Sequence, residues 1–112
     1  MDKTVKYEQI IIDFLRNYAS VPYANKPEVE NQLVIDRENH HYQLVAIGWH
    51  GDKFVYHPVF HFDIRNGKIW VQQNNTEETI AEYLLENGVP PTDIVAGFYP
   101  PSLRAQTGFA VA

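Results

Sequence analysis

The chain has 112 residues, the size of one ordinary domain, and no cysteine, which excludes disulfides, thiolate nucleophiles and cysteine-ligated metal sites. Hydrophobic residues make up 45% and charged residues 21%, a globular composition that argues against disorder over most of the chain. The net charge is −5 and the basic residues are scattered, so we expect no direct binding to DNA or RNA. These properties predict a single domain over residues 1–112.

The N-terminal residues and the apolar runs of the sequence bear on the cellular location of the protein. Residues 1–6 lead into an amphipathic stretch rather than the long apolar core of a signal peptide. The sequence also holds no run of 18 apolar residues, so we expect no membrane span. A cytoplasmic location is therefore expected.

Apolar residues at spacings of three and four predict a first helix that begins at Asp2 or Thr4, the two candidate N-caps, and ends at Tyr18. The polar face of this helix is not basic, which favours packing on a sheet over binding to a membrane surface. Proline and asparagine within residues 19–27 mark the loop that follows. The apolar stripe comprises Val5, Ile10, Ile11, Ile12, Phe14, Leu15 and Tyr18.

Four strand-like segments come next, at residues 29–36, 42–49, 54–64 and 69–73, joined by short turns. The strongest hairpin signal among these turns is Asn66-Gly67, because both turn residues must adopt positive φ. Successive strands with short connections predict an antiparallel meander. Since Pro58 cannot donate a hydrogen bond to the ladder, we expect a bulge or an outward-facing edge within the third segment.

A second helix is predicted after Thr76, the expected N-cap, with Glu77 and Glu78 suitably placed at the positive end of the helix dipole. Gly88 is the expected stop, and the prolines that follow prevent continuation. Each helix carries one apolar stripe, and a meander has one face to cover. The expected fold is therefore α+β: an antiparallel β-meander of four or more strands with two main helices packed on one face.

Histidines in the third strand raise the possibility of a metal site. His57, His61 and Asp63 share one parity of that strand, and zinc and iron sites often combine two histidines with a carboxylate. Residues four apart on a strand lie about 13 Å apart, too far for joint ligation without a bulge. The competing interpretation is a half-buried sheet face with His61 hydrogen-bonded. A metal-dependent enzyme or nuclease using these three residues is thus the alternative function.

Other catalytic arrangements are not supported by the sequence. Ser20 and Ser102 lack the surroundings of a nucleophile elbow, and no glycine-rich phosphate loop is present. The acidic residues lie at or near turns, where solvated carboxylates are normal. We therefore expect no catalytic residue, no metal, no cofactor and no enzymatic activity.

Aromatic residues near the C-terminus indicate a contact surface. The segment Tyr99–Arg104 is a proline-stiffened loop with an aromatic residue and an arginine, which suits an arm that binds with little loss of entropy. The charge-free end of the chain, residues 108–112, is expected to dock on the fold or to add a strand. The candidate residues of a partner interface are Tyr99, Arg104 and Phe109.

The third strand also predicts self-association. Both of its parities are apolar, with Phe54 and Phe60 on one and Val55 and Val59 on the other, so neither face suits solvent alone. Either residues 109–111 cover the face that the helices leave open, or a second subunit covers it. Two-fold pairing is the commonest solution, so we expect a homodimer.

Several motifs together resemble the XisI family. They are DRENHHYQLVAIGW at residues 36–49, HFDIRNGKIWVQ at 61–72, TEETIA at 76–81, and the ending TGFAVA at 107–112. The resemblance extends over nearly the whole chain, and these motifs are specific in combination.

The resemblance implies a function that the composition does not reveal. The family is named for the fdxN element excision controlling factor of filamentous cyanobacteria, associated with programmed excision of a DNA element during heterocyst development. Its members are commonly paired with XisH, which is similar to nuclease-fold proteins. The resemblance therefore implies a non-catalytic controlling factor that binds a XisH-like partner, and it carries over no active-site residue.

Overall fold

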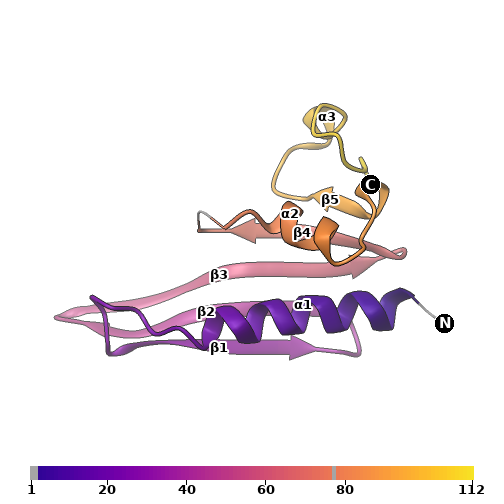
Figure 1. Ribbon diagram of the computed structural model, residues 1–112. Helices are drawn as coiled ribbons and strands as arrows, with labels where there is room; N and C mark the ends of the chain where they lie inside the picture. Colours follow the sequence, from indigo (N-terminus) through magenta and orange to yellow (C-terminus); the bar gives the residue numbers. More distant parts are fainter. Residues whose placement is uncertain (1–2, 77) are drawn as a thin grey trace.

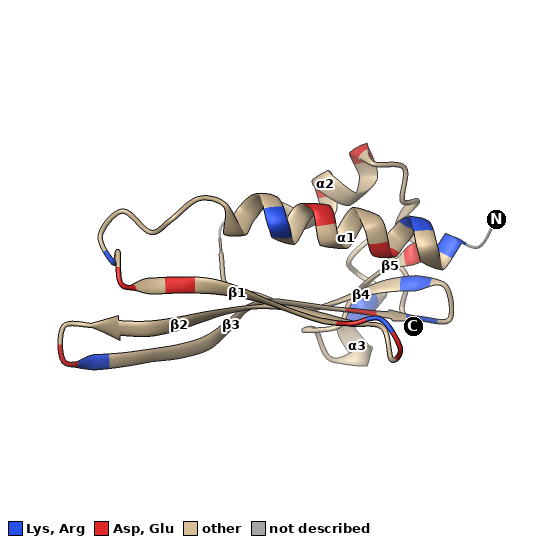
Figure 2. Ribbon diagram, turned by 90° about the horizontal axis from the view of Figure 1, so that it is seen from below, with Lys and Arg blue, Asp and Glu red and all other residues tan. Residues whose placement is uncertain are grey.

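One five-stranded sheet organises the fold, with helices on both of its faces (Figures 1 and 2). The computed structural model describes residues 3–76 and 78–112, so the candidate cap Asp2 and the helix-dipole residue Glu77 lie outside the described residues. The elements are α1 (Lys3–Ala19), β1 (Val29–Asp36), β2 (His41–His50), β3 (Lys53–Arg65), β4 (Lys68–Asn74), α2 (Ile80–Glu86), η1 (Pro91–Asp93), β5 (Ile94–Ala96) and α3 (Pro101–Arg104).

The strand order is β1-β2-β3-β4-β5, and the first four strands pair antiparallel. This confirms the predicted meander. β5 pairs parallel to β4, because α2 and η1 carry the chain back before it re-enters the sheet. The end of the chain then joins the same edge: Ala110 forms a parallel bridge with Val95, and its amide donates to the Ile94 carbonyl at 2.8 Å.

Both main helices lie on the same side of the sheet, as predicted (Figure 2). α1 buries Tyr7, Ile11, Ile12 and Leu15 in one cluster with the sheet, and α2 adds its own apolar residues to that cluster. Burying such a stripe is what stabilises a helix of this length in water. Among the described residues, no helix combines the length and apolar character needed to cross a bilayer.

A bulge in β3 changes which side chains face the core. Across β2 and β3, Val45 pairs with Pro58 but Leu44 pairs with Phe60, so Val59 is an extra residue. The bulge expected at Pro58 is therefore confirmed. The bulge switches which residues of β3 face the core. Before Pro58 the odd-numbered residues lie on the side of α1, and from Phe60 onward the even-numbered residues do.

The parity switch overturns two expectations for β3. Phe54 and Phe60, expected on one face, lie on opposite faces, because Phe54 pairs with exposed Trp49 and Phe60 with buried Leu44. His57 pairs with Ala46, on the face that packs on α1, whereas His61 pairs with Gln43 on the other face. The expectation that His57, His61 and Asp63 share one face is therefore wrong. A regular strand would have kept them together, and the extra residue between them separates them.

The second helix begins later than predicted. α2 starts at Ile80 with Thr79 in the N-cap position, so the expected cap at Thr76 is wrong. Thr76 instead stabilises the preceding turn: its hydroxyl donates to Asn74 Oδ1 at 2.6 Å and accepts from the Glu78 amide at 3.0 Å. The helix ends as expected, with Gly88 in the left-handed region at φ +90°.

We call the sheet face away from α1 and α2 the open face. α3 lies on this side, below β4 and β5 in the view of Figure 2. Over β1, β2 and β3 the open face instead exposes large apolar side chains. They are Val34, Trp49, Phe54 and Tyr56, with exposed fractions of 48%, 53%, 54% and 65%.

Candidate functional site

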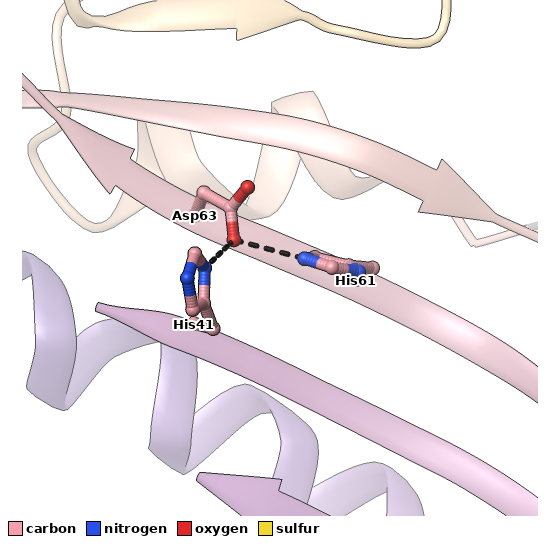
Figure 3. Close-up of side chains that lie close together, drawn as sticks. All are labelled: His41, His61 and Asp63. Atoms are coloured by element: carbon pink, nitrogen blue, oxygen red, sulfur yellow. Dashed lines mark hydrogen bonds and ion pairs between the residues drawn. The ribbon is translucent and has the colours of Figure 1, made fainter. Parts of the chain in front are cut away.

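Three polar side chains meet on the open face, at the end of β2 and β3 nearest the turn that precedes β2 (Figure 3). Asp63 Oδ1 lies 2.7 Å from His41 Nδ1 and 2.8 Å from His61 Nε2. His61 and Asp63 share a face because they are two residues apart on one strand. His41 joins them from the neighbouring strand, where it is the direct partner of Asp63. We call these three residues the His–Asp cluster.

The bulge in β3 is what brings His41 to Asp63. A regular register continued from the pair of His50 and Lys53 would place His41 opposite Phe62. The extra residue, Val59, moves the register by one, so that Asp63 lies there instead. The same irregularity that removes His57 from this face therefore supplies His41 to it.

Asp63 is buried, with 3% of its surface exposed, and its second carboxylate oxygen is also occupied. Asp63 Oδ2 accepts two hydrogen bonds, one from Gln72 Nε2 at 3.1 Å and one from Arg65 Nη2 at 3.3 Å. Burial by itself would raise the pKa of Asp63, but the hydrogen bonds from His41, His61 and Gln72 outweigh it and hold the pKa below its ordinary value. The cluster is thus built around a buried, ionised carboxylate.

The two histidines of the cluster differ in their surroundings. The Nδ1 atom of His61 lies 2.9 Å from Gln43 Nε2, so both ring nitrogens of His61 have partners and its orientation is fixed. The side chain of His41 is half exposed, at 49%. The arrangement therefore offers one fixed and one accessible imidazole on a common carboxylate, which suits proton transfer or metal ligation.

His57 is placed away from this cluster. It is exposed, its Nδ1 lies 3.5 Å from the neighbouring Pro58 carbonyl, and it borders a recess on the helical side together with Tyr18 and Val29. The alternative site that combined His57 with His61 and Asp63 is therefore wrong in its first residue. Sequence reasoning missed His41, because its contribution depends on the register between two strands.

A ladder of side chains continues from the cluster toward the C-terminus. Trp70 pairs with Asp63 across β3 and β4, and the guanidinium carbons of Arg65 and Arg104 each lie 5.0 Å from the centre of its ring. Cation–π contacts of this kind contribute about 0.5–1 kcal/mol each at exposed sites. Arg104 also donates to the Tyr99 carbonyl at 3.1 Å, which fixes the loop before α3.

The predicted interface residues have different surroundings. Tyr99 is 45% exposed, and its ring centre lies 4.7 Å from that of Phe98, which is 52% exposed. Arg104 is engaged with Trp70 and the backbone, as described above. Phe109 is half-buried and packs against the core cluster. A role of Tyr99, Arg104 and Phe109 in binding a partner stays a prediction.

An aromatic pocket of 570 Å³ opens on the other side of the molecule, at the C-terminal end of α1. Its lining includes Phe14, Tyr18, Tyr23 and Tyr83. Burial raises the pKa of each of the three tyrosines above its ordinary value. The pocket therefore presents uncharged rings at neutral pH and lies on the face opposite the His–Asp cluster.

Comparison with known proteins places this fold in a family. The family model described as XisI protein matches residues 1–111. A XisI-like protein from Anabaena variabilis is 45% identical, with a TM-score of 0.90, over 97% of this chain and 99% of that one. The fdxN element excision controlling factor XisI from the same organism is 35% identical, with a TM-score of 0.84, over 99% and 100%. No curated protein matches. The resemblance seen in the sequence is confirmed, and the chain belongs to the XisI family.

Proposed function

We propose that this chain is a non-catalytic controlling factor of DNA-element excision, which acts in the cytoplasm by binding a XisH-like, nuclease-fold partner. Membership of the XisI family supports this, as does the name of the structural relative, an excision controlling factor. The observation that carries the proposal is the exposed apolar surface of the C-terminal arm, which we define as residues 98–104.

The arm has the properties of a pre-organised binding surface. Phe98, Tyr99 and Leu103 are between 45% and 52% exposed, and the two rings contact each other. Two prolines and the hydrogen bond from Arg104 to the Tyr99 carbonyl restrict the backbone between them. A rigid aromatic surface loses little entropy on binding, so a large share of its buried area contributes to affinity.

The charge distribution favours a protein partner over direct contact with DNA. The net charge is −5, and Figure 2 shows both acidic and basic positions along α1 rather than a basic stripe on that helix. Proteins that bind DNA directly neutralise a row of phosphates with clustered lysine and arginine. We therefore propose that any effect on DNA passes through the partner.

Substitutions in the arm test this function. Tyr99→Ala is expected to weaken binding to a XisH-like protein at least about tenfold, because exposed tyrosines that become buried at an interface are frequent hot spots. Val21→Ala is the matched control, since Val21 is 67% exposed and lies in the loop after α1. The measurement is a titration of purified partner monitored by calorimetry. Equal affinities of the two variants would contradict the role of the arm.

We further propose that the open face pairs with a second copy of the chain. Trp49 and Phe54 are each more than half exposed and contact each other, with ring centres 5.2 Å apart, and Val34 and Tyr56 extend the same apolar surface. The C-terminal segment joins the opposite edge of the sheet, at β5, and leaves these residues uncovered. Sedimentation at micromolar concentration is expected to give a dimer, and Trp49→Ser a monomer. A wild-type chain that sediments only as a monomer would contradict this pairing.

A further inference from the structure

The His–Asp cluster has a donor set that fits a metal ion. His41, His61 and Asp63 each offer one ligand atom, and these three atoms all lie within 4.8 Å of one another. Two imidazoles and a carboxylate are typical ligands of zinc and related divalent transition metals. We propose that His41, His61 and Asp63 bind one divalent transition-metal ion of the zinc class. This inference is independent of partner binding by the arm.

The cluster can admit an ion when its side chains, chiefly that of His41, adjust their positions. With metal–ligand bonds of about 2.0–2.2 Å, neighbouring ligands of a tetrahedral ion lie about 3.3 Å apart. The two histidine nitrogens now lie 2.7 and 2.8 Å from Asp63 Oδ1, so each must move away by about half an ångström to admit the ion. The two imidazole nitrogens lie within 4.8 Å of each other and must come to a similar separation of about 3.3 Å. The half-exposed side chain of His41 can turn to meet both requirements, while buried Asp63 stays in place.

Neighbouring side chains already hold the ligands as a metal site requires. Gln72 and Arg65 occupy Asp63 Oδ2, which leaves Oδ1 directed at the two histidines. Gln43 contacts the second ring nitrogen of His61. When the ion binds His61 Nε2, the proton resides on Nδ1 and donates to the Gln43 side-chain oxygen, which a rotation of the amide supplies.

The ligand set also predicts which ions bind. Imidazole favours zinc, nickel and copper, whereas magnesium and calcium prefer sites made of oxygen atoms alone. Three protein ligands leave a fourth position for water, and the exposure of His41 keeps that position open to solvent. Arg65 lies near the carboxylate and opposes the cation, but it is half exposed and solvent screens its charge.

Zinc binding to tag-free, chelator-treated protein tests the proposal, with ZnCl₂ as the titrant in calorimetry. The wild-type chain is expected to bind one equivalent with a dissociation constant below about 100 μM. His41→Ala is expected to weaken that binding at least about tenfold. His57→Ala is the matched control, because His57 is an exposed histidine on the opposite face, and it is expected to leave the affinity unchanged.

Two results would overturn the proposal. One is a wild-type dissociation constant above about 100 μM, weaker than three converging ligands should give. The other is an affinity that His41→Ala leaves within tenfold of wild type, which would place the zinc elsewhere. Circular dichroism of the His41→Ala variant checks that it is folded, as expected for a half-exposed side chain. A visible absorption band of bound Co²⁺, present in wild type and lost in this variant, gives a second readout of the same ligands.

Discussion

Replacing Asp63 by asparagine probes the centre of the His–Asp cluster. The substitution keeps the shape of the side chain and removes its charge. Asp63 accepts hydrogen bonds from His41, His61, Gln72 and Arg65, and it is 3% exposed. An asparagine offers one oxygen to these donors and turns an NH₂ group toward the others. We expect a folded but less stable protein.

The size of the effect follows from these contacts. Hydrogen bonds to a charged group contribute about 1.5–3 kcal/mol each, against about 0.5–1.5 kcal/mol for neutral ones. The two short bonds from His41 and His61 therefore lose about 1 kcal/mol each, and the NH₂ group facing a donor adds a similar cost. Arg65 is half exposed, so its ion pair adds little. The free energy of unfolding should fall by about 2–3 kcal/mol, which lowers Tm by about 10 °C.

The pH dependence gives the effect a distinguishing sign. The pKa of Asp63 is lower in the folded protein than its ordinary value, so the stabilisation is fully present above the unfolded-state pKa of about 3.9. It is lost as the pH falls through the folded-state pKa, because the carboxyl then becomes protonated. The difference between wild type and Asp63→Asn should therefore be constant near neutral pH and shrink in strongly acidic solution.

Urea unfolding of both proteins across this pH range is the assay. Asp52→Asn is the matched control, since Asp52 lies exposed in the turn between β2 and β3, and it should change the free energy of unfolding by less than about 0.5 kcal/mol. A loss below about 1 kcal/mol for Asp63→Asn at neutral pH would refute the reasoning. A difference that grows in acid would refute it as well.

Gly48→Ala, with Gly51→Ala as its control, and Tyr7→Phe test how the fold is held together. Gly48→Ala should lower the free energy of unfolding by more than about 2 kcal/mol, because Gly48 has φ +146° and a Cβ there would lie 2.3 Å from the Glu28 carbonyl oxygen. Gly51 has φ +65° and open space around it, so Gly51→Ala should lower it by about 1 kcal/mol in the same urea assay. Tyr7→Phe should cost about 1–2 kcal/mol at neutral pH, because it removes the buried hydrogen bond to Asp93, and the cost should shrink in acid as Asp93 becomes protonated. Burial opposes ionisation of Asp93, but its hydrogen bonds with Tyr7 and Lys3 keep its pKa below the ordinary value. The stabilisation by this carboxylate is therefore present at neutral pH and lost in acid.

Much of the fold follows from periodicity and turn chemistry. The apolar stripe of residues 5–18 predicts α1, and the alternation and turns of residues 29–73 predict the meander. β5 was not predicted as a strand, because three apolar residues after two prolines carry no period. The start of α2 was misplaced because Thr76 suits a cap and a turn equally well, and local hydrogen bonds to Asn74 select the turn.

The candidate site depended on a feature that sequence patterns represent poorly. Pro58 signals that β3 is irregular, but it does not say on which side of it the extra residue lies or which faces result. One inserted residue inverts every later side chain of a strand and shifts its partner by one position. That shift replaces His57 by His41 in the cluster. The sequence therefore predicted the kinds of side chain, two histidines and one carboxylate, but named one of the histidines wrongly.

Co-purification with a XisH-like protein tests the proposed function most directly. The two chains are co-expressed with a tag on the partner alone, and the eluted complex is quantified at low and at high salt. We expect both chains in a fixed ratio at both salt concentrations, because the exposed side chains of the arm are mainly apolar and salt does not screen such contacts. Elution of the partner without this chain at every salt concentration would contradict the proposal.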